Sequence, residues 1–212
     1  MLKVLHPFCF SHFYSMKKVM LGLKMATDPR WVNIAEKNIE DILTDHAWCE
    51  QKAASNAIST VTRFPDYPEL VDELIRVSLE EMTHFKMVVD EIKKRGMTLG
   101  FEQKDPYVGD LQRFIKKGGG RIHQLVQALL LSAMIEARSC ERFRLLSEEI
   151  QDEGLRAFYR DLMVSEAEHY AMFIGFARKY GQELNVDQMW KEFLDYEASL
   201  MVNYGKSESI HG

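Results

Sequence analysis

Cysteine is scarce in this chain of 212 residues, and the three cysteines present do not form a pairing pattern. Cys9, Cys49 and Cys140 lie too far apart for a C-x-x-C motif, and an odd number cannot be joined completely in disulfides. Small secreted domains depend on even sets of cysteines, whereas reducing compartments keep thiols free. The cysteine content therefore predicts a reduced, cytoplasmic protein.

An excess of positive charge is also lacking. The chain has 27 Lys and Arg residues against 32 Asp and Glu residues, which gives a formal net charge of -5. A generally basic nucleic-acid-binding protein carries the opposite balance, so this class is disfavoured. A local basic face remains compatible with the total.

No apolar run suggests export or a membrane span, and we expect no membrane association. The first nineteen residues mix Phe, His, Lys and Ser without a helical or strand period, and they lack the apolar core of a signal peptide. We predict that 1–19 is a disordered extension or a mis-assigned translation start. The remainder, 20–212, is expected to form one domain, because the 46% hydrophobic content is sufficient for a single core.

Helical periodicity dominates the chain after Met20. Proline and glycine mark helix ends: Asp28-Pro29 opens the first helix, Pro68 opens the second, and Gly96 closes it. A long connection follows, with one short helix near 109–115. We predict an all-α four-helix bundle with a long crossover between helices two and three and an additional C-terminal helix. The expected helices are 29–62, 68–95, 121–149, 154–180 and 186–203.

Two E-x-x-H motifs, at 81–84 and 166–169, lie within these helical patterns. Three residues advance a helix by about 4.5 Å, so the Glu and His of each motif leave the same face. Each motif also follows another helical glutamate: Glu50 precedes the first by 31 residues, and Glu136 precedes the second by 30. The repeated constellation consists of Glu50, Glu81, His84, Glu136, Glu166 and His169.

All six side chains fall on the apolar stripes of their helices, so we expect them to face the core. A buried carboxylate without a partner costs several kcal/mol, and no Lys or Arg lies on these stripes. Two divalent metal ions would supply four positive charges against the four carboxylates. One Glu from each of two helices with Glu-x-x-His from each of two others is the ligand set of ferritin-like dinuclear carboxylate proteins. The sequence therefore predicts a ferritin-like bundle with two metal ions.

Other polar residues near the motifs have simpler interpretations. His46, one turn before Glu50, is expected to be a packed core histidine, with a hydrogen bond to the metal ligands as the alternative. Glu80 is expected to orient a ligand imidazole across the bundle. Cys49 and Cys140 are expected to fill the core. The remaining acidic residues, among them Glu91, Glu141 and Glu168, are expected on solvated faces.

Several runs of the sequence resemble the MiaE family, the non-haem diiron tRNA-(2-methylthio-N6-isopentenyladenosine) hydroxylases. The resemblance extends from Met20 to the C-terminus, and it implies that the same six residues hold two iron ions. It further implies an O2-dependent hydroxylase, with O2 as the co-substrate and the isopentenyl chain next to the tRNA anticodon as the substrate. The electrons would come from an external electron donor, an electron-transfer partner. The runs are Met20–Lys24, Thr27–Val32, Asp45–Ala57 and Ile135–Phe143.

Cations around the crossover are the expected tRNA contacts, since Lys116, Lys117 and Arg121 flank a Gly-rich loop that can adapt to a phosphate backbone. The modified base would have to leave the anticodon-loop stack to reach the bundle. Further candidate cations are Lys93–Arg95, Arg113, Arg138, Arg142 and Arg144. Apolar residues expected to line a slot for the isopentenyl chain are Met82, Phe85, Met134, Phe143 and Phe173.

Two hypotheses from other classes remain open at this point. A bacterioferritin-like iron-storage or ferroxidase protein shares the duplicated ligands and would assemble into a large hollow shell. A metal-stabilised interaction module would hold the ions without chemistry and would consume no O2 after reduction.

Overall fold

The computed structural model describes residues 21–104, 106–116, 118–204 and 209–210. The predicted extension 1–19 lies outside the described residues. Among those described, no strand occurs, and no helix is long and apolar enough to cross a membrane. The helices are α2 (Trp31–Lys37), α3 (Ile39–Arg63), α4 (Pro68–Lys94), α5 (Pro106–Phe114), α6 (Arg121–Glu149), α7 (Glu153–Tyr180) and α8 (Val186–Met201).

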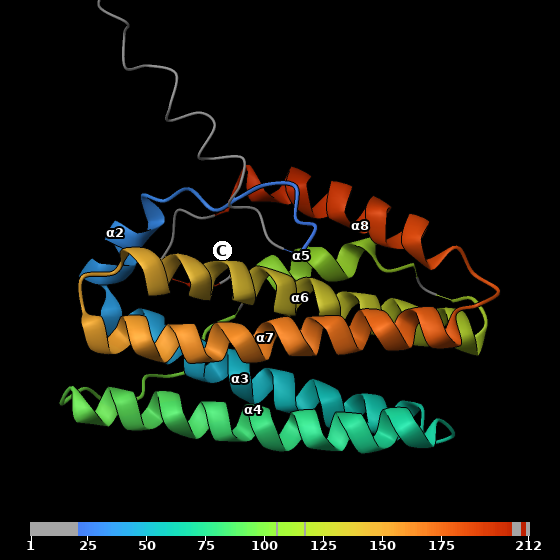
Figure 1. The fold of residues 1–212 in the computed structure, drawn as a ribbon, viewed down its shortest axis with the longest axis horizontal. Coiled ribbons are helices and arrows are strands. Elements are labelled where there is room, and N and C mark those ends of the chain that lie inside the picture. The colour runs from blue at the N-terminus through green and yellow to red at the C-terminus, as the bar shows by residue number, and fades with distance from the viewer. Residues whose placement is uncertain (1–20, 105, 117, 205–208, 211–212) are drawn as a thin grey trace, which may run out of the picture.

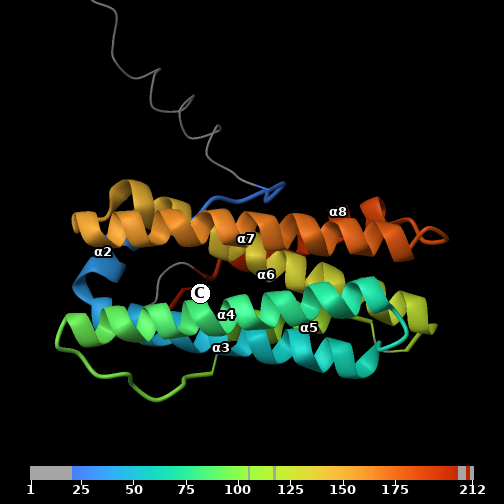
Figure 2. The same cartoon turned by 60° about the horizontal axis from the view of Figure 1, so that its bottom comes forward.

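Four long helices form the body of the molecule as two antiparallel pairs, α3 with α4 and α6 with α7 (Figures 1 and 2). The crossover from α4 to α6 contains α5, which lies with α8 beside α6 and away from α4 (Figure 1). The prediction of a ferritin-like bundle with a long crossover and an additional C-terminal helix is thus confirmed.

Local sequence signals explain most helix ends. Pro68 stands in the first turn of α4, where a missing N–H costs nothing, and Lys93 and Lys94 stand in its last turn, where cations favour the helix dipole. Gly96 follows with φ +72°, a left-handed conformation that favours glycine. The Asp152 side chain caps α7 by accepting a hydrogen bond from the Leu155 N–H at 2.9 Å.

The first predicted helix, 29–62, is wrong in one respect, because the chain breaks at Asn38 into α2 and α3. Asn38 has φ -130° and ψ 44°, outside the helical region. Its amide Nδ2 donates to the Ile34 carbonyl at 2.9 Å, the local bonding by which asparagine competes with helical structure. The other differences are small: α5 begins at Pro106, ahead of the expected 109, and α8 ends at Met201.

Two apolar clusters fill the bundle, one toward each end. The first includes Leu74, Val77 and Phe173, and the second includes Leu43 and Phe143. Each long helix contributes residues to both clusters. The six predicted ligands occupy the middle of their helices, between the two clusters, so apolar packing fixes their backbone positions from both sides.

A buried ionic network corrects the expectation that Arg138, Arg142 and Arg144 face tRNA, because all three side chains are buried. Arg138 Nη2 donates to Glu197 Oε1 of α8 at 2.5 Å, and its Nη1 donates to Glu141 Oε2 at 3.1 Å. Glu141 was expected on a solvated face but is fully buried in this network, and Glu91 is buried as well. The network joins α8 to α6.

Candidate metal centre

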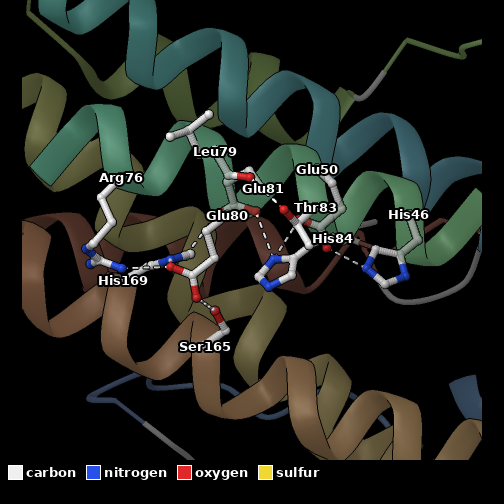
Figure 3. A network of polar contacts seen from close by, with 10 residues as sticks. All are labelled: His46, Glu50, Arg76, Leu79, Glu80, Glu81, Thr83, His84, Ser165 and His169. Carbon is white, nitrogen blue, oxygen red and sulfur yellow. Dashed lines mark hydrogen bonds and ion pairs between the residues drawn. The ribbon is translucent and has the colours of Figure 1, made fainter.

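The six predicted ligands meet in the bundle interior, carried by α3, α4, α6 and α7. All of them are buried, and the most exposed, His84, has only 6% of its surface accessible. Figure 3 shows Glu50, Glu81, His84 and His169 converging between the helices. The expectation that all six side chains face the core is therefore confirmed, and their role as metal ligands stays a prediction.

Their donor atoms form two overlapping groups. One oxygen or nitrogen each from Glu50, Glu81, His84 and Glu166 lie within 4.8 Å of one another, and a second group of Glu81, Glu136, Glu166 and His169 meets the same limit. Glu81 and Glu166 belong to both groups, as carboxylates that bridge two ions would. Each group has one imidazole.

Burial and mutual repulsion disturb the ionisation of the carboxylates. Burial raises the pKa of Glu50 well above its usual value, and the neighbouring Glu81 raises it further. The pKa of Glu166 is raised in the same way by burial and by Glu136. Protons therefore occupy part of the cluster when no cation does, and bound metal ions would displace them.

Glu81 behaves differently because two imidazoles face it. Its Oε1 lies 2.8 Å from His169 Nδ1, and its Oε2 lies 3.3 Å from His84 Nδ1. Burial alone would raise the pKa of Glu81, but hydrogen bonding to both histidines holds it below its usual range. Burial likewise opposes the charge on His169, but Glu81 raises its pKa to about 9.

The cluster fits two iron ions on its own geometry. Glu166 Oε1 is buried without a hydrogen-bond partner in the described part of the chain. Such an unsatisfied buried group is rare in native proteins unless an ion or water completes it. Carboxylate and imidazole donors suit non-haem iron. Four carboxylates and two imidazoles can therefore hold two iron ions.

Glu80 contacts the outer side of His169 (Figure 3). Its Oε2 lies 3.2 Å from His169 Nε2, while Ser165 Oγ donates to Glu80 Oε1 at 2.8 Å and Arg76 Nη1 donates to Glu80 Oε2 at 2.7 Å. The structure thus brings together the pair for which an orienting role was predicted. Ligating histidines commonly have such a carboxylate on their second nitrogen.

His46 combines both alternatives that the sequence allowed. Its Nε2 lies 2.6 Å from Glu50 Oε1, and its ring packs with centroids 4.7 Å from Phe143 and 5.5 Å from Tyr159. The histidine therefore closes the core beside Glu50 and holds that carboxylate in place. Cys140 fills the core as predicted, and burial raises the pKa of its thiol to about 12.

A cavity of about 400 Å³ reaches Glu136 from the surface between α3, α5 and α6. Of the five apolar residues predicted to line a slot, Phe173 lies in its wall, whereas Met82 is 44% exposed and Phe143 packs against His46. The sequence interpretation missed the small and polar lining residues. A comparison of the two repeats offers the signal, because Ser132 stands one turn before Glu136 where His46 stands before Glu50.

The predicted tRNA contacts stand apart from this cluster. Arg121 is 53% exposed in its side chain and is paired with Asp66, and it also donates to the Arg63 carbonyl at 3.1 Å. Lys116 is exposed, and Lys117 lies outside the described residues. Arg113 is exposed and paired with Asp110.

Two relatives of this chain have the same name. A relative from Pseudomonas putida KT2440 is 36% identical over 76% of this chain and 77% of its own length, and its name is tRNA 2-(methylsulfanyl)-N(6)-isopentenyladenosine(37) hydroxylase. A Salmonella typhimurium LT2 protein of the same name is 26% identical over 92% of this chain and 89% of its own.

A solved structure has the same fold. The Synechococcus "Protein 43 with aldehyde deformylating oxygenase activity" superposes with a TM-score of 0.82 at 31% identity, covering 91% of this chain and 96% of that one. At the family level, the model described as tRNA-(MS[2]IO[6]A)-hydroxylase (MiaE) matches residues 14–212. The fold, the duplicated ligand set and this match agree, and the chain belongs to the MiaE family of tRNA hydroxylases.

Proposed function

We propose that this protein is an O2-dependent diiron monooxygenase that hydroxylates the isopentenyl chain of 2-methylthio-N6-isopentenyladenosine next to the tRNA anticodon. The family membership and the names of the two relatives support the substrate. The observation that carries the proposal is the meeting of two overlapping ligand groups with a cavity that ends at Glu136.

The six residues have distinct roles in this proposal. Glu50 and His84 would hold one iron and Glu136 and His169 the other, and Glu81 and Glu166, which belong to both groups of donor atoms, would contribute to both. Bound iron supplies the reduction of O2 and the insertion of one oxygen atom into a C–H bond, chemistry outside the reach of protein side chains. The net reaction joins R–H, O2, two electrons and two protons to give R–OH and water.

The rest of the site holds these residues and controls access. His46 fixes Glu50 and Glu80 orients His169, so each half of the site has one supporting contact. Apolar packing surrounds the cluster except where the cavity reaches Glu136, and this dry environment strengthens the electrostatic interactions inside. The electrons come from an external donor, which we propose is a separate electron-transfer partner.

The tRNA substrate is proposed to bind with its anticodon loop over the crossover, with Lys116, Lys117 and Arg121 contacting phosphates. Reaction in the bundle interior requires the modified base to leave the loop stack, which is easier from single-stranded RNA than from a duplex. Free thiols and a tRNA substrate are consistent with a cytoplasmic location.

The direct test supplies reduced, iron-loaded protein with 18O2 and with tRNA that bears the isopentenyl modification. We expect one 18O atom in the new hydroxyl group, measured by mass spectrometry of the digested nucleosides. Unlabelled oxygen in the product would indicate hydration by water and would contradict the proposal. If tRNA stays unmodified and the protein elutes as a large shell, the storage hypothesis replaces it.

The ligand assignment has its own measurement, iron content after anaerobic loading. We expect about two irons per chain, with reduced occupancy in His84→Ala and in His169→Ala. Glu168→Ala is the matched control, because Glu168 is exposed on the same helix turn as His169. Equal iron in all three variants would contradict the assignment.

A further inference from the structure

The space beside the first glutamate of each ligand repeat is filled to a different extent in the two repeats. Beside Glu50, the imidazole of His46 fills the space and packs against Phe143 and Tyr159. The corresponding position before Glu136 holds Ser132, whose side chain is far smaller. Space therefore remains on the Glu136 side, and it is the 400 Å³ cavity. This size lies within the range of about 300–1,000 Å³ that is typical of small-molecule sites.

The cavity changes in character along its depth. Val77 and Phe173 line it at the inner end near Glu136, and both are almost fully buried. Asn56 and Gln112 line its exposed part, where α3 faces α5. A ligand that matches this change from apolar to polar lining has an apolar group at its inner end and polar groups at its outer end.

We propose that this cavity binds the alkylated adenine base, with the alkyl chain directed toward Glu136, and that Gly109 sets the size of base that can enter. The proposal rests on the proposed function, because the chain must present a C–H bond to the metal pair. It assigns a substrate site to residues outside the ligand set.

Asn56 provides the polar contact for the base. Its Nδ2 donates to Ser132 Oγ at 3.0 Å, which links α3 to α6 across the cavity wall. The amide has a second N–H and a carbonyl acceptor, the groups with which Asn binds adenine edges. The hydrogen bond to Ser132 holds the amide plane, so the contact is preorganised.

A cation at the rim matches the phosphates that flank the base in tRNA. Lys52, Glu102 and Lys104 all line the cavity. Lys52 Nζ lies 2.9 Å from Glu102 and also donates to the Gln103 carbonyl at 3.2 Å, so Glu102 offsets its charge and the lysine fastens the crossover to α3. Lys104 is then the cation in excess among these three lining residues, and it suits a nucleotide better than an uncharged hydrocarbon.

Gly109 stands inside α5 and lines the cavity. Glycine in a helix interior is destabilising relative to alanine, so a local reason for its presence is expected. A Cβ built at Gly109 meets no atom within 4 Å, so the space beside this glycine is open. Because Gly109 lines the cavity, that space is available to a bound base, and a larger side chain there would occupy it.

The test is Gly109→Phe, which adds a ring to the cavity wall from a Cβ position that has no atom within 4 Å. Gly175→Phe is the matched control, because Gly175 is an exposed helical glycine on α7 whose Cβ also meets nothing within 4 Å. Binding of 2-methylthio-N6-isopentenyladenosine nucleoside to iron-loaded protein is measured by equilibrium dialysis. We expect Gly109→Phe to weaken binding about tenfold or more and the control to match the unchanged chain.

Two further variants keep the test informative if the phenylalanine disturbs α5. Gly109→Leu adds a smaller side chain at the same place and should also weaken nucleoside binding. Asn56→Ala should raise the KM for tRNA more than it lowers kcat, because the amide contacts the base and not the reacting carbon. Iron content should stay unchanged in every variant.

The outcomes separate this site from the reaction itself. Turnover of tRNA by the unchanged chain, with equal nucleoside binding in both Gly109 variants, would overturn the site and leave the hydroxylase function intact. If the unchanged chain binds the nucleoside, the Gly109 variants do not, and none of these proteins hydroxylates tRNA, the binding site is supported and the hydroxylase function is contradicted. If an aliphatic aldehyde such as octanal binds and the nucleoside does not, the assignment of the cavity to a base is wrong.

Discussion

His169 has each ring nitrogen facing a carboxylate, Nδ1 toward Glu81 at 2.8 Å and Nε2 toward Glu80 at 3.2 Å. One nitrogen can therefore bind metal while the other is held, which fixes the plane of the ring. Ser165 and Arg76 in turn hold Glu80. Residues of α4 and α7 thus cooperate in orienting one ligand.

We predict that Glu80→Gln lowers iron affinity by about 10-fold to 100-fold, the usual cost of losing a charged partner of a ligating histidine. Competition with a chelator measures the affinity. Glu73→Gln is the matched control, because Glu73 also accepts a hydrogen bond from Arg76, at 2.9 Å, and is exposed on the same helix. Equal affinities in the two variants would show that Glu80 does not support the site.

Individual residues also show what the sequence can and cannot predict about the site. The burial of the six proposed ligands follows from helical periodicity, and the proposal that they bind metal follows from the cost of burying charge; both are local properties of each helix. The burial of Glu141 and Arg138 does not follow, because it depends on how α8 packs against α6. The cavity is less predictable still, since its shape depends on side chains of five helices.

At the level of elements, the long helices were predicted closely because their ends carry proline, glycine and capping signals. The break at Asn38 was missed, since asparagine is tolerated inside helices and only its contact with Ile34 O marks the end. The packing of α5 and α8 was not predictable from periodicity. Tyr107 of α5 donates to Glu197 of α8 at 3.1 Å, and Glu197 accepts from Arg138 of α6.

We predict that Arg138→Met lowers the free energy of unfolding by about 3–5 kcal/mol, because Glu197 then loses its paired cation in a fully buried place, while Glu141 keeps Arg144 at 3.7 Å. Urea denaturation measures the change. Arg178→Met is the control, since its pair with Asp187 is exposed and contributes about 1 kcal/mol or less. Adding Glu197→Met to Arg138→Met should recover part of the stability, and a further decrease would contradict this account.

At the level of the whole molecule, we propose that 20–212 folds as one domain without a contribution from 1–19. The described core begins at Leu23, while the family match begins at residue 14. A chain that starts at Met20 is expected to keep its melting temperature and its iron content. A large fall in melting temperature would show that part of 1–19, with 14–19 the first candidates, belongs to the domain.

Binding of tRNA depends on a local surface, because a chain with a net charge of -5 has no general excess of cations to bind phosphates. Lys116→Glu with Lys117→Glu should raise the KM for tRNA and reduce its salt dependence, by about 0.7 in logarithmic slope for each single-strand phosphate that the protein no longer neutralises. Lys37→Glu, a reversal of an exposed lysine at the end of α2, is the control and should leave both quantities unchanged.

Arg121 needs a separate variant, since reversing its charge would also place two acidic groups together at Asp66. Arg121→Gln removes the charge, and Asp66→Asn breaks the same pair while keeping the arginine. If Arg121 contacts phosphate, Arg121→Gln weakens tRNA binding and Asp66→Asn strengthens it or leaves it unchanged. Equal weakening by both would mean that the pair only stabilises the start of α6. Iron content should be constant throughout, because these residues lie outside the ligand cluster, so tRNA affinity can be altered without altering the metal site.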